Sequence, residues 1–288
     1  MTEKKKTVAK ETRKRQLIKN ETVRALLYGL GLAVWVFAAF TVVQIICVLI
    51  AQALFSNEIL AKPISNLIFS AVTYVVAVAV IIFVPWKLIK LKTTRDELGL
   101  RGLPTWTDIL MAPLGLIVTM FGAGILMLIM KWLIPGINLE QEQDVGFNNL
   151  IGRAEMIEGF IALVIIAPIA EELIFRGWLY GKLRARMTAV SAIVICSALF
   201  GILHGQWNVG ITVFAMSVVM CLIRELTGTI WSGVLVHMLK NGIAFYLLYV
   251  VMMSANQLRT DIPLDSIIEM MNEENFFYLD RSNDNFES

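Results

Sequence analysis

Three ionisable residues lie in the middle of an apolar stretch, and their spacing divides them between two roles. The segment 165–183 has the sequence IIAPIAEELIFRGWLYGKL and contains Glu171, Glu172 and Arg176. Residues four apart share a helix face, so Glu172 and Arg176 are expected to pair. Glu171 is turned about 100° away from that pair. It is therefore free to act on a substrate or a water molecule. The alternative is a single buried ion-pair cluster that only joins helices.

Both histidines of the chain lie in apolar stretches further along. His204 follows Phe200 by four residues. His237 precedes Asn241 by the same spacing, so these two share a helix face. A single histidine in a helix is more commonly a packed, hydrogen-bonded residue, but here every histidine lies in a stretch of this kind. His237 and Asn241 can donate hydrogen bonds to one point in a cavity, as an oxyanion requires.

Two hydrolytic mechanisms fit two glutamates, two histidines and one asparagine. In the first, a glutamate and a histidine activate a water, and the second histidine and the asparagine stabilise the tetrahedral oxyanion. In the second, Glu171, His204 and His237 bind Zn²⁺, which lowers the pKa of a bound water. These ligands would come from three separate segments, because the chain has no HExxH motif. Both mechanisms predict amide hydrolysis within or beside a membrane, with either no cofactor or zinc.

The elements that must position these residues follow from the composition. Hydrophobic residues make up 57% of the 288 residues and charged residues 17%. In a soluble domain about 45–50% of residues are apolar and about 25% are charged. Because backbone in lipid must satisfy its own hydrogen bonds, each apolar stretch is expected to be a helix. We therefore predict an all-α, polytopic integral membrane helix bundle with about seven transmembrane helices, or six to eight. The stretches lie near 26–55, 67–89, 108–134, 156–181, 188–206, 209–224 and 229–253.

Charged residues in the connections predict orientation and domain limits. Residues 1–24 contain nine Lys/Arg and three Glu, and residues 135–155 are acidic. Lys and Arg are enriched in cytosolic connections, so we expect a cytosolic N-terminus, an extracytoplasmic C-terminus and a location in the plasma membrane. The predicted organisation is a basic segment 1–24, a membrane bundle 25–253 and an acidic, partly disordered tail 254–288. The basic segment is expected to touch anionic lipid and not nucleic acid.

The segment around Glu171 carries two further structural signals. An ionisable side chain at the bilayer centre costs roughly 2.5–3.5 kcal/mol on insertion scales, so it normally faces the bundle interior or a wet cavity. Pro168 removes a backbone donor and predicts a kink that opens room beside Glu171. Gly177 and Gly181 form a small-xxx-small pair, which predicts the close approach of a neighbouring helix.

Taken together, three motifs resemble the CAAX-protease and bacteriocin-processing family, also called the Abi family. They are Glu171-Glu172-xxx-Arg176, Phe200-xxx-His204 and His237-xxx-Asn241, within about 155–253. This family of intramembrane proteases includes the type II CAAX prenyl endopeptidases. The resemblance implies that Glu171 and His204 activate the attacking water. It also implies that His237 and Asn241 form the oxyanion hole. Supporting roles fall to Glu172, Arg176 and Phe200. The family has been described as metalloproteases and as glutamate-dependent enzymes, so both mechanisms stay open.

The leading hypothesis for function is an intramembrane CAAX-type endopeptidase that cleaves a membrane-associated peptide or protein. Its expected partners are membrane lipid and that substrate. A first alternative is a non-catalytic membrane scaffold, or a bacteriocin-immunity or regulatory factor, on the same fold. A second is a transporter that uses the carboxylates as a proton relay, although the sequence shows no inverted repeat in its support.

Overall fold

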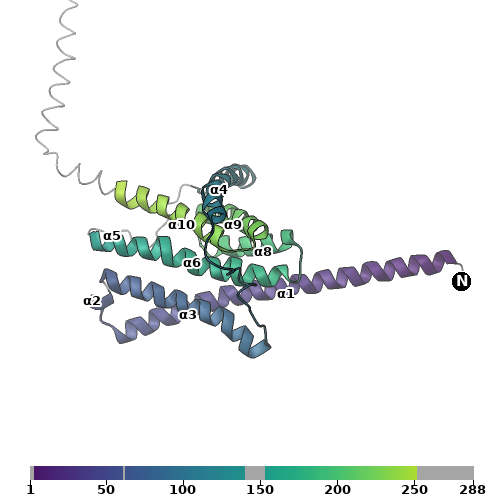
Figure 1. Ribbon diagram of the computed structural model, residues 1–288. Helices are drawn as coiled ribbons and strands as arrows, with labels where there is room; N and C mark the ends of the chain where they lie inside the picture. Colours follow the sequence, from purple (N-terminus) through teal and green to yellow (C-terminus); the bar gives the residue numbers. More distant parts are fainter. Residues whose placement is uncertain (1–2, 61, 140–152, 252–288) are drawn as a thin grey trace, which may run out of the picture. The chain divides into compact units, whose positions relative to one another are not determined.

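The computed structural model describes residues 3–60, 62–139 and 153–251 (Figure 1). Every regular element in these ranges is a helix, which confirms the all-α class. The predicted tail 254–288 and most of the acidic connection lie outside the described residues. The chain up to Gly242 forms one compact unit, and the residues from Ile243 onward belong to a second.

Two π-helical segments join three short helices into one continuous helical run from Arg153 to Arg184. The helices are α1 (Glu3–Leu54), α2 (Asn57–Leu60), α3 (Pro63–Ile89), α4 (Trp106–Leu133), α5 (Arg153–Phe160), α6 (Ala167–Glu172), α7 (Tyr180–Arg184), α8 (Ala189–Ile202), α9 (Trp207–Thr227) and α10 (Trp231–Phe245). The π-helical segments are η1 (Ile161–Ile166), η2 (Leu173–Leu179) and, in the second unit, η3 (Tyr246–Val251).

Four helices among the described residues are long and apolar enough to cross a membrane. They are Lys19–Leu54, Ile64–Ile89, Trp106–Leu133 and Trp207–Thr227. Large apolar side chains on α1, α3 and α4 face outward, including Leu49, Val75 and Phe121. A soluble monomer seldom exposes so much apolar surface, whereas lipid accommodates it. The chain is thus an integral membrane protein, and the number of seven spans stays a prediction.

Several predicted boundaries were wrong, because charged residues were taken as the ends of spans. The helix α9 has 21 residues, not about 16. It continues past Arg224 and Glu225, since Glu225 pairs with Arg184 at 2.6 Å and Arg224 donates to the Glu97 carbonyl at 3.1 Å. The helix α1 runs without a break from the basic segment into the first apolar stretch, and the domain limit at residue 24 stays a prediction. The helix α8 ends at Ile202, four residues before the predicted end.

The helical run that carries Glu171 lies in the core of the first unit. In η2, Ile174, Trp178 and Leu179 are almost fully buried within the main hydrophobic cluster. Around this core α1 packs along α3, and α9 packs against both α4 and α8 (Figure 1). The carboxylates are therefore held on a central element that cannot turn freely.

A buried aspartate at the start of α4 fixes where α10 begins. Asp108 and Thr105 form a reciprocal capping box that satisfies free N–H groups of α4. The other carboxylate oxygen of Asp108 accepts hydrogen bonds from Thr229 at 3.0 Å and from Ser232 at 2.6 Å. These bonds link α4 to Thr229 in the turn before α10 and to Ser232 in the first turn of α10, the helix that carries His237 and Asn241.

The glycine pair of the central run contacts a loop and not a helix, which corrects the prediction. A Cβ at Gly177 would lie 3.2 Å from the Leu98 carbonyl oxygen, and one at Gly181 would lie 2.7 Å from that of Glu97. The same loop is tied down by Lys182, which donates to the Glu97 carboxylate at 2.9 Å. Burial would raise the pKa of Glu97, but this bond and one from the Thr94 N–H hold its pKa below the usual value.

Candidate active site

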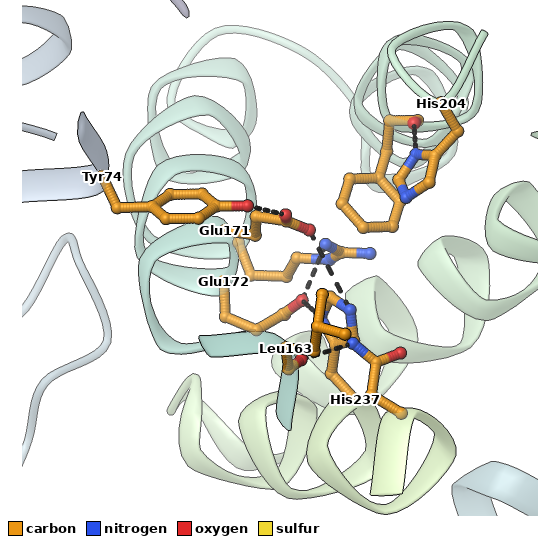
Figure 2. Close-up of polar contacts among 9 residues, drawn as sticks. Tyr74, Leu163, Glu171, Glu172, His204 and His237 are labelled. Atoms are coloured by element: carbon orange, nitrogen blue, oxygen red, sulfur yellow. Dashed lines mark hydrogen bonds and ion pairs between the residues drawn. The ribbon is translucent and has the colours of Figure 1, made fainter. Parts of the chain in front are cut away.

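The predicted pair between Glu172 and Arg176 is formed. Arg176 Nη1 donates to Glu172 Oε1 at 2.8 Å, and both side chains are fully buried (Figure 2). The same oxygen lies 3.2 Å from Nδ1 of His237. Because a carboxylate oxygen only accepts, Nδ1 of His237 is the donor in this contact. Glu172 is therefore engaged by a cation and a histidine at once.

Glu171 is in a different environment, as its helical offset predicted. Its Oε1 accepts a hydrogen bond from the Tyr74 hydroxyl at 2.8 Å, and its Oε2 lies 3.9 Å from His237 Nε2 (Figure 2). The side chain is 15% exposed, whereas that of Glu172 is wholly buried. No lysine or arginine of the described residues forms an ion pair with Glu171. Its carboxylate thus stays accessible, whereas that of Glu172 is buried against a cation.

His204 lies in the turn after α8, and not within an apolar helix as predicted. Its Nδ1 is 2.8 Å from the carbonyl oxygen of Phe200. Since a carbonyl only accepts, Nδ1 carries the proton, and Nε2 of the neutral ring holds the lone pair. The ring satisfies a carbonyl that the helix end leaves unpaired.

The ring of Phe200 connects the three motifs. Its centroid lies 4.9 Å from that of His204 and 5.9 Å from that of His237, both edge-to-face. The guanidinium of Arg176 stacks 4.4 Å from the same ring, a cation–π contact. Phe200 therefore holds the relative positions of two imidazoles and one cation, which gives its place in the motif a physical reason.

Asn241 is held by a carbonyl that the helix geometry sets free. Its Nδ2 donates to the Leu163 carbonyl at 2.9 Å (Figure 2). In an α-helix the N–H of Ala167 would occupy that carbonyl. In η1 this N–H bonds instead to Ala162, and Pro168 has no N–H to replace it. Because Pro168 lacks an N–H, the Leu163 carbonyl in this π-helical turn stays open to Asn241. The second amide hydrogen of Asn241 remains available for a ligand.

The predicted zinc ligands do not form a metal site in this arrangement. Within the described ranges no group of three or more His, Cys, Asp or Glu side chains could hold a metal ion. His237 directs Nδ1 to Glu172, and His204 directs Nδ1 to a backbone carbonyl. Both contacts leave Nε2 as the nitrogen that a metal ion would take, so zinc binding by Glu171, His204 and His237 stays a prediction.

Two residues of the site were not identified from the sequence. Tyr74 is the one tyrosine of the stretch 67–89, a polar side chain in a span, and this signal could have found it. Gly233 precedes His237 by one helical turn. A Cβ at Gly233 would lie 2.9 Å from Oε2 of Glu172. Glycine at this position therefore makes room for the buried carboxylate.

We expect Gly233→Ala to destabilise the protein by about 1–3 kcal/mol, because the added methyl displaces a carboxylate that Arg176 and His237 hold in place. Gly242→Ala is the matched control on the same helix, since its Cβ would meet Val164 at an ordinary 3.5 Å. That change should be neutral or stabilising by up to about 1 kcal/mol, as alanine favours helix. Thermal unfolding in detergent micelles measures both, and equal melting temperatures for the two variants would contradict the role of Gly233.

Comparisons with known proteins match the part of the chain that contains these residues. Residues 154–243 match the family model described as "Type II CAAX prenyl endopeptidase Rce1-like". This segment is Rce1-like. It includes every predicted catalytic residue, so the resemblance to the CAAX-protease and bacteriocin-processing family that the three motifs predicted is confirmed. Tyr74 and the helices α1, α3 and α4 lie outside the Rce1-like segment.

A curated relative covers a longer part of the chain. The "Putative membrane peptidase YdiL" of Bacillus subtilis (strain 168) is 28% identical over 147 residues, which are 51% of this chain and 56% of the relative. The chain therefore spans little more than half the length of this relative. No solved structure gives a significant match.

Proposed function

We propose that the protein is an intramembrane endopeptidase that hydrolyses a peptide bond in a membrane-associated peptide or protein. One observation carries the proposal. Of two adjacent carboxylates, Glu172 is engaged by Arg176 and His237, while Glu171 is held by the neutral Tyr74 hydroxyl and lies near His237. An accessible carboxylate with spare acceptor capacity beside a histidine is equipped for general-base catalysis.

In the proposed mechanism Glu171 and His204 activate the attacking water. Glu171 takes a proton from the water as the water oxygen bonds to the substrate carbonyl carbon. The Nε2 lone pair of His204 accepts the water's other hydrogen and orients the molecule. The proton on Glu171 then passes to the amide nitrogen as the carbon–nitrogen bond breaks, which releases an acid and an amine.

His237 and Asn241 stabilise the negative charge on the substrate oxygen in this proposal. In this role His237 carries a proton on each ring nitrogen, with Nδ1–H bonded to Glu172 and Nε2–H directed to the oxyanion. The amide hydrogen of Asn241 that does not bond Leu163 is the second donor. Arg176 and Glu172 position His237, and Phe200 packs against both histidines.

Reconstitution of the purified protein with a membrane-peptide library tests the mechanism. His204→Asn keeps an N–H near the position of Nδ1 for the Phe200 carbonyl and removes the Nε2 lone pair. We expect this variant to cleave about 10²- to 10⁴-fold more slowly than the wild type, by mass spectrometry of the products. Full activity of His204→Asn would remove the histidine from the mechanism. Exhaustive chelation should leave wild-type activity intact if Glu171 needs no metal.

We also infer that the N-terminus is cytosolic and the C-terminus extracytoplasmic. The inference rests on alternation of basic connections, with Lys87, Lys90 and Lys92 in one of them and Lys182 with Arg184 in another. Cysteine-labelling reagents that do not cross membranes should modify an added cysteine at residue 288 in intact cells but not one at residue 2. The reverse labelling pattern would invert the orientation.

A further inference from the structure

A lysine that belongs to none of the three motifs lies between the two residues of the third. Lys240 follows His237 by three residues and directly precedes Asn241 on α10. Its side chain is partly buried, and it forms no hydrogen bond or ion pair with any residue that the structure describes. Ionisable side chains within a membrane protein normally pair with one another or face a wet cavity. An unpaired ammonium in this position therefore points to a function.

Helical spacing places Lys240 on the face of α10 that contacts the carboxylates. It follows Gly233 by seven residues, which is about two turns, so the two lie about 20° apart around the helix. A Cβ at Gly233 would lie 2.9 Å from Oε2 of Glu172. His237, about 60° from Lys240 around the helix, contacts Glu172 and lies near Glu171 (Figure 2). The lysine side chain thus starts from the helix face that forms the candidate active site.

The ammonium of Lys240 acts on the site through its charge without contacting a carboxylate. It attracts the Glu171 carboxylate, and its charge also acts on the His204 ring. A lysine that only neutralised Glu171 would be expected to pair with it, as Arg176 pairs with Glu172 at 2.8 Å. The Lys240 nitrogen is also not one of the enclosed polar atoms that lack a partner. Its three N–H donors therefore remain accessible beside the proposed base.

The charges of the site leave a place for one more anion in the proposed mechanism. The two carboxylates of the site are matched by two cations, which are Arg176 and Lys240. In that mechanism His237 carries a proton on each ring nitrogen, which adds one positive charge. Buried charges are unfavourable unless they are compensated. A carboxylate of the substrate would compensate this charge, whereas an ammonium would add another.

We propose that Lys240 binds a carboxylate of the substrate close to the cleaved bond and thereby selects substrates that have one. The proposal rests on the endopeptidase function given above. An ammonium forms charge-assisted hydrogen bonds with a carboxylate, which are stronger than those with a neutral amide. Because Lys240 adjoins Asn241, a proposed oxyanion donor, the bound group would lie near the cleaved bond. An acidic side chain and the C-terminus of the substrate are the two sources of such a group.

The test measures binding separately from cleavage. Full-length His204→Asn protein in lipid nanodiscs cleaves slowly and keeps the charges of the site. It is crosslinked to a photo-reactive apolar peptide that has no charged residue and an amidated C-terminus. Unlabelled peptides then compete in two series. The first has an amidated end and aspartate or asparagine at each position in turn. The second has no acidic residue, increasing length, and a free or an amidated end. We expect the best carboxylate peptide to compete about tenfold better than its uncharged counterpart, as a charge-assisted hydrogen bond provides.

Matched variants assign the preference to Lys240. Lys240→Met keeps a long apolar side chain without the ammonium, so the preference should fall close to one. Lys240→Gln, a second uncharged replacement, should give the same result, whereas Lys240→Arg should retain most of the preference. Lys131→Met is the control, because Lys131 is an exposed lysine in the last turn of α4. Its preference should equal that of the parent protein. Crosslinking of the uncharged peptide, which needs no lysine, should be unchanged in every variant and reports correct folding.

Each outcome decides one of the two proposals. A preference near one in both series, or one that survives Lys240→Met and Lys240→Gln, overturns the Lys240 site even if wild-type protein cleaves peptides. A preference that depends on Lys240, together with wild-type protein that cleaves none of the peptides, supports the site and overturns the endopeptidase function. A preference confined to one series supports the site and identifies the carboxylate as that of a side chain or of a chain end. If Lys240→Met in the wild-type background slows cleavage of all peptides equally and leaves competition unchanged, Lys240 only balances the charge of Glu171 and the proposal fails.

Discussion

Replacing Glu171 by glutamine is expected to lower the rate of peptide hydrolysis by about 10²- to 10⁴-fold, the usual contribution of a general base. Glutamine keeps the size of the side chain, and its carbonyl oxygen can still accept the Tyr74 hydroxyl. The substitution therefore removes the proton acceptor and little else. Single-turnover cleavage of a quenched membrane peptide in proteoliposomes, with excess protein, measures the chemical step directly.

Glu158→Gln serves as the matched control for this experiment. Glu158 belongs to α5 in the same helical run and lies outside the three motifs. Its variant should cleave at the wild-type rate, which would show that loss of a carboxylate from this run is tolerated elsewhere. Glu171→Gln protein that is folded and retains more than a tenth of the wild-type rate would rule out Glu171 as the base. The scaffold alternative predicts, in addition, that cells tolerate this variant.

Arg176→Leu is expected to destabilise the protein by about 3–5 kcal/mol. The guanidinium and the Glu172 carboxylate are both fully buried at 2.8 Å from one another. Removal of one partner leaves an uncompensated charge, which costs far more than the intact pair contributes. Loss of the cation–π contact with Phe200 adds to the effect. Thermal unfolding of the purified variant, followed by tryptophan fluorescence, measures the change.

The double variant Glu172→Leu/Arg176→Leu separates stability from function. Replacing both members of a buried ion pair by apolar residues is often close to neutral, so the double variant should recover most of the stability that Arg176→Leu loses. It should not recover cleavage, because His237 loses the carboxylate that holds its Nδ1. A double variant as active as the wild type would show that the pair is only structural. One as unstable as Arg176→Leu would contradict the charge argument.

Helical periodicity accounts for what the sequence predicted correctly. Residues four apart share a face whatever surrounds them, so the Glu172–Arg176 pair and the separate environment of Glu171 could be derived from spacing alone. The same reasoning placed His237 and Asn241 on one face of α10. The catalytic roles of these residues stay predictions, because only kinetic measurements on variants test them.

The rest of the site depends on contacts between segments distant in sequence. Tyr74 reaches Glu171 across 97 residues, and the Glu97 carbonyl that limits Gly181 comes from a loop before α4. No local pattern encodes such contacts. The C-terminal end of α8 was also missed, since the apolar residues continue past Ile202 although the helix does not. Gly205 in the following turn has a φ of +70°, which glycine adopts readily, and this was the available signal.

The π-helical turn before Pro168 has a consequence for comparing this chain with its relatives. Such a turn holds more residues than an α-helical turn. Deletion of Ala162, the residue whose carbonyl accepts from the Ala167 N–H, would favour α-helical pairing, in which this N–H returns to the Leu163 carbonyl. Asn241 would then lose its acceptor. Alignments are normally adjusted to remove a one-residue gap inside a helix. In this helix such a gap would mark a relative whose asparagine is oriented by another acceptor.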